Sequence, residues 1–244
     1  MNQSQFNQGK QRPAIISWAG YLALTLLLAL PVAILTVRAG AWQQGLLIYA
    51  ISCLGSLILL ALLAVLWLLP RFTGWRGAIL QRALFALPGA VLLVTTLLSR
   101  GDYPPIHDIS TDLGDPPAFS AAGEQRGPGS NSLETDAEAM ALQAKAYPDL
   151  QTVVIARSYD EVFDSAVQVA AEMGWEIYFQ DRNAGIIEAV ATTALMNFKD
   201  DVVIRLRTNA DGTLVDLRSV SRVGIGDLGA NANRIREFRH RLLQ

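Results

Sequence analysis

Three long apolar stretches open this chain, and after residue 100 the apolar positions become short and periodic. The stretches cover about residues 14–37, 45–69 and 77–98, and only the third is interrupted by a charge, at Arg82. Each can supply the ~20 residues, rising about 1.5 Å per residue, that a helix needs to cross a hydrocarbon core of ~30 Å. The pattern therefore predicts three transmembrane helices.

A cleaved signal peptide is the alternative for the first stretch. Its apolar run of about 24 residues is longer than the ~7–15 residues of a signal-peptide core. The tripeptide at 39–41, Ala-Gly-Ala, resembles a cleavage site only weakly. We therefore expect an anchor that is retained.

Beyond residue 150, apolar positions recur at the spacings of individual helices and strands. Ser158 and Glu161 form a capping-box pattern ahead of a helix, which Gly174 ends. A last helix is expected over about 231–243. Five segments have the alternation or composition of strands: 152–156, 175–180, 186–193, 201–207 and 213–223. The order predicts an α+β fold in which an antiparallel sheet carries helices on one face.

The segment between the anchor and this domain is rich in proline and in turn-forming residues. Residues 103–119 contain four prolines and are expected to be extended and turning rather than helical. Residues 120–132 are rich in Gly and Ser and are expected to be a mobile linker, and 134–146 are expected to form a helix. The predicted organisation is an N-terminus (1–13), an anchor (14–99), an extended connecting segment and linker (100–150) and a folded domain (151–244).

Charge separates the same two regions. The first hundred residues contain no Asp or Glu, whereas the other 144 hold 13 Lys and Arg against 22 Asp and Glu, a formal charge of −9. Lys10 and Arg12 precede the first stretch, and a cluster of three arginines (71, 76 and 82) lies around the start of the third, whereas Arg38 and Arg100 stand alone. The positive-inside rule then places the N-terminus in the cytoplasm and the domain outside it.

A charge within a span can also mark a transport pathway. No carboxylate accompanies Arg82 in the three stretches, so a channel or pump is disfavoured. We expect Arg82 instead to extend its guanidinium group to the cytoplasmic interface.

Cysteine content and charge exclude several classes of function. The only cysteine, Cys53, lies in the second stretch, so the domain has no thiol for catalysis, metal binding or disulfide exchange. The acidity of the domain argues against nucleic acid as a partner. The glycines at 224–229 do not form a dinucleotide-binding fingerprint, and no cofactor is expected.

Several motifs occur in an order that resembles a known family. They are Pro105-Ile-His-Asp-Ile-Ser-Thr-Asp112, Ala146-Tyr-Pro-Asp149, Asp200-Asp-Val, Arg218-Ser-Val-Ser-Arg-Val-Gly224 and Asp227-Leu-Gly-Ala-Asn231. Over about residues 103–243 the chain resembles the family of domains of unknown function numbered 1499. The resemblance implies a bacterial protein that is membrane-tethered or exported, with no established activity. With the charge pattern, it predicts a multi-pass protein of the inner membrane whose domain lies in the periplasm.

A cluster of histidine and carboxylates is one candidate site. His107, Asp108 and Asp112 could bind a metal or supply a general base. Aspartates in such a segment also stabilise turns by accepting hydrogen bonds from nearby amides. We favour the second interpretation and predict no metal site. Asn231 is a further candidate polar residue, or a cap of the last helix together with Asp227.

Four arginines are expected on the face of the sheet that lies away from the helices. Arg205 and Arg207 alternate with apolar residues in one predicted strand, and Arg218 and Arg222 do so in the next. Guanidinium groups bind phosphate and carboxylate, so this face could bind an anionic lipid or polymer, or a protein of the cell envelope. The alternative, which we favour, is internal ion pairing with nearby acids: Asp108, Asp112, Asp216 and Asp227.

The two densest motifs, 106–112 and 218–231, carry opposite charges, and we expect them to meet in space. The expected contacts are arginine–aspartate pairs that join Arg218 or Arg222 to Asp108 or Asp112. The sequence thus predicts a membrane-tethered, extracytoplasmic binding or structural module. The alternative is an envelope enzyme, hydrolytic or metal-dependent, that uses His107, Asp108, Asp112, Arg218 and Arg222.

Overall fold

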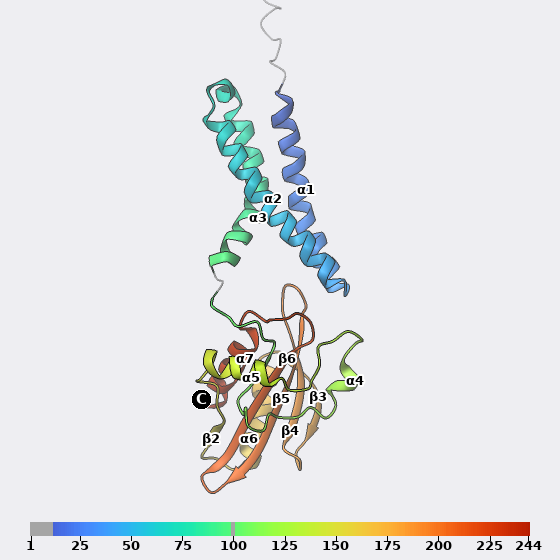
Figure 1. Ribbon diagram of the computed structural model, residues 1–244, viewed down its shortest axis with the longest axis vertical. Helices are drawn as coiled ribbons and strands as arrows, with labels where there is room; N and C mark the ends of the chain where they lie inside the picture. The colour runs from blue at the N-terminus through green and yellow to red at the C-terminus, as the bar shows by residue number, and fades with distance from the viewer. Residues whose placement is uncertain (1–11, 99–100) are drawn as a thin grey trace, which may run out of the picture. The chain divides into compact units, whose positions relative to one another are not determined.

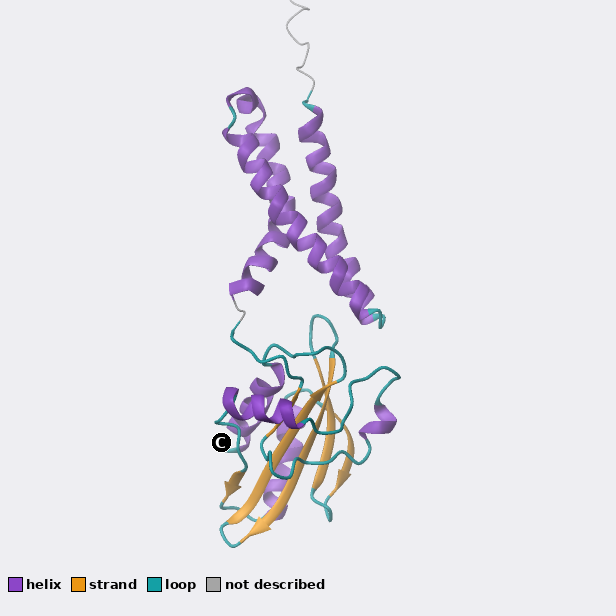
Figure 2. Ribbon diagram, viewed as in Figure 1, coloured by secondary structure: helices purple, strands orange, loops and turns teal. Residues whose placement is uncertain are grey.

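The computed structural model describes residues 12–98 and 101–244 (Figure 1). The chain divides into two units, Met1–Arg100 and Gly101–Gln244. The described part of the first unit is helical, and the second unit combines strands and helices (Figure 2). The division coincides with the change in hydropathy and charge along the sequence.

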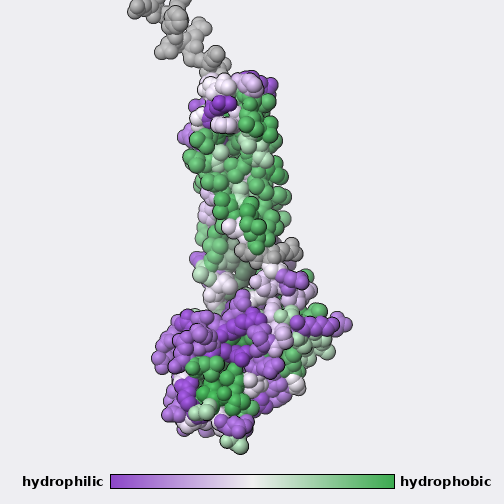
Figure 3. Space-filling view, turned by 90° about the vertical axis from the view of Figure 1, so that its left-hand side faces the viewer, coloured by the Kyte–Doolittle hydropathy of each residue, from purple (hydrophilic) through white to green (hydrophobic). Residues whose placement is uncertain are grey.

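The first unit contains three long apolar helices, as the sequence predicts. They are α1 (Ala14–Arg38), α2 (Trp42–Leu68) and α3 (Arg76–Leu98), with a short 3₁₀ helix, η2 (Pro70–Trp75), between α2 and α3. By length and composition, each is able to cross a membrane. The face of the bundle seen in Figure 3 is largely apolar, so this unit is suited to a lipid environment.

Small residues bring α2 and α3 close together. A Cβ atom placed on Gly89 would come within 2.5 Å of the Ser56 hydroxyl oxygen and 3.3 Å of the Ser52 carbonyl oxygen. Such close approach lets helices associate by packing where lipid tails are as apolar as the side chains. A polar contact joins α1 to α3, because Nε of Arg82 donates to the carbonyl oxygen of Ile16 at 3.1 Å.

The second unit is built on a six-stranded antiparallel sheet, and the predicted α+β class is confirmed. The strands are β1 (Asp108–Ser110), β2 (Val153–Ile155), β3 (Glu176–Asp181), β4 (Ile186–Thr192), β5 (Lys199–Asn209) and β6 (Gly212–Ser221). Their order is β1-β6-β5-β4-β3, and β2 also pairs with β6. β1 and β2 lie end to end along β6, because β1 pairs with residues 218–220 and β2 with residues 213–215.

Two helices cover one face of this sheet, α6 (Tyr159–Glu172) and α7 (Ala230–Leu242). The predicted capping box of Ser158 and Glu161 is present at the start of α6. Phe163 of α6 and Phe238 of α7 are buried in one apolar cluster with residues of β4, β5 and β6. Phe238 also stacks on Trp175, with ring centroids 5.3 Å apart. This cluster is the hydrophobic core of the domain.

Two further helices precede β2: α4 (Ala122–Gln125) and α5 (Ala137–Ala146). α5 begins later than the expected residue 134, because the carboxylate of Asp136 accepts hydrogen bonds from the first amides of the helix. The amide of Ser110 donates to Oε1 of Gln143 in α5 at 3.0 Å, and Nε2 of Gln143 donates to the Ser110 carbonyl. These two bonds pair backbone groups that would otherwise be unpaired on the free edge of β1. β1 itself is a strand that the sequence analysis did not predict.

Candidate functional site

Two arginines of β5 share two carboxylates on the face of the sheet that α6 and α7 leave open. Asp216 of β6 lies directly opposite Arg205 and is fully buried. Its carboxylate accepts hydrogen bonds from the NH2 groups of Arg205 and Arg207 at 3.1 and 2.7 Å. Asp112 accepts from the same two groups at 3.0 and 3.1 Å, and Asp115 accepts from Arg205 at 2.9 Å. The strand alternation predicted from the sequence places both arginines on this side.

The carboxyl group of Asp112 sits in a turn beneath these guanidinium groups. Burial acts to raise its pKa, but hydrogen bonds from the amides of Asp115 and Gly114 and the charge of Arg205 together hold the pKa below its usual value. Asp112 therefore stabilises a turn and binds arginine at the same time. The sequence analysis weighed the turn against a metal site or general base, and the ion pairing against an external anion.

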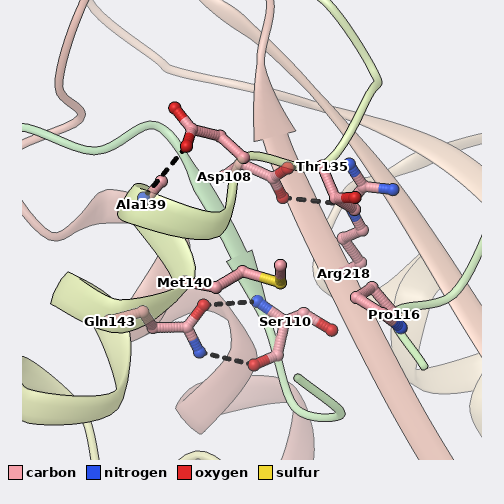
Figure 4. Close-up of a pocket in the computed structure, with 9 residues that line it drawn as sticks. Asp108, Ser110, Pro116, Thr135, Ala139, Met140, Gln143 and Arg218 are labelled. Atoms are coloured by element: carbon pink, nitrogen blue, oxygen red, sulfur yellow. Dashed lines mark hydrogen bonds and ion pairs between the residues drawn. The ribbon is translucent and has the colours of Figure 1, made fainter. Parts of the chain in front are cut away.

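Arg218 of β6 pairs with Asp108 of β1. Its Nε and NH2 groups donate to the two oxygens of the carboxylate at 3.0 and 2.7 Å, a bidentate pair (Figure 4). The same guanidinium group donates to the carbonyl oxygens of Leu133 at 2.7 Å and Pro117 at 3.4 Å. Only 4% of the Arg218 side chain is exposed. The two densest sequence motifs thus meet, through β1 and β6.

Arg222 does not bond either of the acids expected for it. Its Nε and NH2 groups donate to Asp201 of β5 at 3.0 and 2.7 Å. Arg126 donates to the same carboxylate, which is fully buried. Of the pairs expected between Arg218 or Arg222 and Asp108 or Asp112, Arg218 with Asp108 forms, whereas Arg222 pairs with Asp201. The reason is distance along the sheet, since Asp201 neighbours the end of β6 across the β5–β6 ladder.

A buried glutamate completes this face. Glu188 of β4 is 0% exposed, and its carboxylate accepts from the backbone amides of Ser120, Ala121 and Ala122 at the start of α4. The phenol of Tyr178 donates to it at 3.1 Å. Burial, and then the charge of Glu188, raise the pKa of Tyr178, so that the phenol remains a donor. The lone acid in the apolar strand sequence Ile-Ile-Glu-Ala-Val-Ala was a signal for this contact.

These contacts show that residues 112–133 lie across the polar side of the sheet; we call them the covering segment, and this side the charged face. Residues 120–132, which the sequence analysis expected to be a mobile linker, contact the sheet through specific bonds. Besides the contacts to Glu188 and Asp201, the amide of Asn131 donates to the Arg222 carbonyl at 2.8 Å, and its side chain donates to the Gly224 carbonyl at 2.9 Å. The partners lie far away in sequence, so composition alone did not reveal them.

The candidate polar residues His107 and Asn231 lie where β1 and β6 meet α7. Asn231 is 0% exposed, and its Nδ2 donates to the His107 carbonyl at 3.0 Å and to the Ser221 hydroxyl at 2.9 Å. Its Oδ1 accepts from the Ser219 hydroxyl at 2.6 Å. The Nδ1 atom of His107 lies 3.2 Å from the Ile225 carbonyl oxygen. These side chains bond the loop that leads into α7.

Two further acids border α7, and neither contacts the charged face. Arg234 pairs with Asp200 and donates to Ser219 at 2.9 Å. Asp227 accepts from the amides of Gly229 at 2.8 Å and Asn231 at 2.7 Å, so it caps α7 rather than pairing with an arginine. Burial raises the pKa of Asp227 despite these bonds, and the charge of Asp200 acts in the same direction.

The space beside these groups is small. A pocket of about 10 Å³ borders Asp108 and Arg218 and is also lined by Met140 and Gln143 of α5 (Figure 4). Such a volume holds about one water molecule. Across residues 12–98 and 101–244, no three His, Cys, Asp or Glu side chains are grouped to hold a metal ion. The site as it stands is a network of paired charges.

A family model described as "Protein of unknown function (DUF1499)" matches residues 108–242, which include every strand and α4 to α7. No curated protein matches the chain.

Proposed function

The chain belongs to the DUF1499 family of proteins of unknown function, and we propose that it is a membrane-anchored binding or structural module of the bacterial cell envelope. In this proposal α1 to α3 hold the protein in the inner membrane. The domain lies on the extracytoplasmic side, where it contacts another envelope protein. The observation that carries the proposal is the internal pairing of the charged face.

The distribution of basic residues supports the proposed topology. Lys10 and Arg12 precede α1, and Arg71 and Arg76 lie around the start of α3, whereas Arg38 is alone at the end of α1. An excess of basic residues marks the cytoplasmic loops of membrane proteins. Three crossings then carry the acidic domain to the opposite side.

The pairing of the candidate residues supports a structural role over catalysis. A general base or nucleophile must present a free atom to a space that admits a substrate. Asp108 is engaged by Arg218, Asp112 by Arg205 and Arg207, and the adjoining pocket has room for about one water. Removing these charges should therefore weaken the fold of the domain before it changes any chemistry.

The low exposure of its arginines also makes the charged face a poor site for an external anion. The side chains of Arg205, Arg218 and Arg222 are 12%, 4% and 12% exposed, and only Arg207, at 41%, has substantial access to solvent. A lipid or acidic polymer would have to displace carboxylates that already bind these groups. The loop between β6 and α7 is different, since Ile225 is 80% and Leu228 67% exposed. This loop is our candidate contact surface for a protein partner.

Thiol labelling tests the topology directly. Cys53 is the only cysteine and is buried in α2, so the unmodified chain should be silent to a membrane-impermeant maleimide on intact cells. Glu134→Cys in the domain should be labelled from outside, and Thr73→Cys in the loop between α2 and α3 should be labelled only after lysis. Both positions are exposed. The opposite pattern would overturn the proposed location.

Site-specific photo-crosslinking tests the binding role. A photoreactive amino acid at Ile225 or Leu228 should give one discrete adduct in living cells, whereas the same group at exposed Lys145 of α5 should give none. A parallel measurement uses the soluble domain, residues 101–244, and vesicles of phosphatidylglycerol. We expect no binding at physiological salt. Binding that Arg207→Gln removes would favour an anion site over a structural network.

A further inference from the structure

The first unit holds a buried guanidinium group and no carboxylate to balance it. Arg82, in the second turn of α3, is 8% exposed. The first hundred residues contain no Asp or Glu, and the first acid in the chain is Asp102. A charge removed from water without a counter-charge is strongly disfavoured, most of all in a bilayer. A counter-ion from outside this unit would relieve this cost.

Part of the guanidinium group of Arg82 is already bonded. Nε donates to the Ile16 carbonyl at 3.1 Å, and NH1 donates to the Ala78 carbonyl at 2.8 Å and to Oε1 of Gln81 at 3.2 Å. These contacts leave the NH2 group, with its two N–H bonds, without a hydrogen-bond partner among the described residues. They also fix the orientation of the planar group, which prepares it to bind a ligand.

A pocket of about 360 Å³ lies in front of Arg82. It is open at one side and lined by both polar and apolar residues of α1 and α3, with Arg12 just ahead of α1: Arg12, Ser17, Gly20, Tyr21, Leu24, Gln81, Arg82 and Phe85. Its volume lies within the range of small-molecule sites. Two arginines that border one space repel each other unless an anion lies between them.

Gly20 and the neighbouring aromatic residues define this place further. A Cβ atom on Gly20 would lie 3.2 Å from Nε of Arg82, so the absence of a side chain on α1 makes room for the guanidinium group. Trp18 and Tyr21 are 71% and 65% exposed on the same turns of α1, with ring centroids 5.9 Å apart. Exposed Trp and Tyr side chains are typical of the headgroup level of a bilayer. The two exposed rings therefore favour a position of this turn, and of the pocket beside it, at the headgroup level of a bilayer.

We propose that this pocket binds the phosphate of an anionic phospholipid, with Arg82 and Arg12 as its ligands. The NH2 group of Arg82 donates to the phosphate from a fixed position, and Arg12 adds a second positive charge. The apolar side chains of Leu24 and Phe85 lie against the start of the acyl chains. Basic pockets between transmembrane helices bind anionic headgroups by the same physics. The proposal concerns the anchor and does not depend on the function of the domain.

The test measures lipid bound to the full-length chain in a neutral detergent by native mass spectrometry. Phosphatidylglycerol and phosphatidylcholine with identical acyl chains are compared at equal concentration. We expect about tenfold preference for phosphatidylglycerol. Arg82→Gln should remove the preference. Inorganic phosphate at millimolar concentration should not displace the lipid, because it cannot use the apolar part of the pocket.

Two more variants keep the result interpretable if Arg82→Gln disturbs the packing of α1 and α3. Arg12 lies ahead of α1, so Arg12→Gln should leave the helical circular dichroism unchanged. It should lower the preference for phosphatidylglycerol severalfold. Arg76→Gln is the matched control. Arg76 also lies at the start of α3, but it bonds the Trp67 carbonyl at 3.2 Å and does not line the pocket. The control should retain the preference of the unmodified chain.

Three results would overturn the proposal. The first is equal binding of the two lipids by the unmodified chain. The second is loss of the preference in Arg76→Gln as strongly as in Arg12→Gln, which would indicate general attraction to basic residues. The third is displacement of the lipid by inorganic phosphate, which would make the pocket a site for the free ion.

Discussion

The two faces of the sheet are covered in different ways. One is buried by α6 and α7 through apolar side chains such as Phe163 and Phe238. The other is buried by the covering segment, residues 112–133, through arginines, carboxylates and backbone amides. A helix with an apolar stripe covers a sheet without directional bonds. The covering segment contributes a few apolar contacts, such as buried Ala122 and Phe119 beneath Arg218, but it is held chiefly by specific hydrogen bonds and ion pairs.

This difference predicts which face of the sheet tolerates amino-acid substitutions better. Apolar contacts of similar volume can replace one another with modest loss. A buried ion pair is asymmetric, because removal of one partner leaves the other charged, buried and without a counter-charge. The charged face should therefore be the more sensitive of the two to substitutions that remove charge, and it should specify one arrangement of the covering segment.

The largest expected effect comes from deleting residues 101–150, which contain β1, the covering segment and α5. A fragment of residues 101–244 should fold alone, whereas a fragment of residues 151–244 should not. The shorter fragment lacks β1, takes the three backbone amides from Glu188 and Arg126 from Asp201, and leaves Arg218 without Asp108. Circular dichroism and urea unfolding distinguish the two. A cooperative transition in the shorter fragment would mean that the charged face adds little stability.

On the apolar face, Phe163→Ala should lower the free energy of unfolding by ~3–5 kcal/mol, because Phe163 is 2% exposed and a cavity would remain. Urea unfolding of residues 101–244 measures the change. Leu142→Ala is the control, since Leu142 is 41% exposed and its loss should change stability by under ~1 kcal/mol. Equal effects of the two substitutions would contradict the core described above.

On the charged face, Arg218→Ala should destabilise the domain by about 3 kcal/mol, because Asp108 would remain partly buried without its partner. Adding Asp108→Ala should restore part of this loss, with a coupling energy of ~1–3 kcal/mol in a double-mutant cycle. Arg222→Ala combined with Asp112→Ala should be additive, because these two residues bond different partners. Coupling in the second cycle would argue against the pairing described.

Acid should weaken the charged face before it affects the apolar one. The pKa of Asp112 is lowered in the folded domain, so its contribution to stability is present above the ordinary aspartate pKa of about 3.9 and is lost as pH falls through the folded value. Asp227, whose pKa is raised, opposes this, because its contribution is lost as pH rises. Asp112→Asn should therefore flatten the fall in stability below about pH 4. An unchanged pH profile would remove this role from Asp112.

The smallest effect is expected for an exposed pair on α7. Arg241 and Glu237 are bonded at 2.7 Å with side chains 42% and 48% exposed. Arg241→Ala should change the free energy of unfolding by under ~0.5 kcal/mol, since exposed i,i+4 pairs contribute little. A loss similar to that of Arg218→Ala would show that ion pairs in this domain do not differ by burial.

The sequence by itself determined the elements whose signal is local. Three apolar runs, of which only the third contains a charge, set the helices of the anchor, and the capping box of Ser158 with an apolar stripe set α6. The alternation at Arg205 and Arg207 placed both arginines on the side of the sheet away from α6 and α7. The opposite charges of the two motifs predicted a pair between Arg218 or Arg222 and Asp108 or Asp112, and the pair that forms is Arg218 with Asp108. Each of these follows from the period of a single helix or strand, or from simple charge complementarity.

Only the tertiary structure decided which acid each arginine binds and what covers the charged face. Arg222 takes Asp201 from the neighbouring strand, and Glu188 binds three amides from a segment about 66 residues earlier in the chain. A backbone amide carries no residue-specific signal, so a segment that binds through its amides looks like a linker in sequence. β1 is three residues long and is stabilised by β6 and by Gln143, not by its own composition. Pairings of this kind depend on register between distant strands, which local periodicity does not encode.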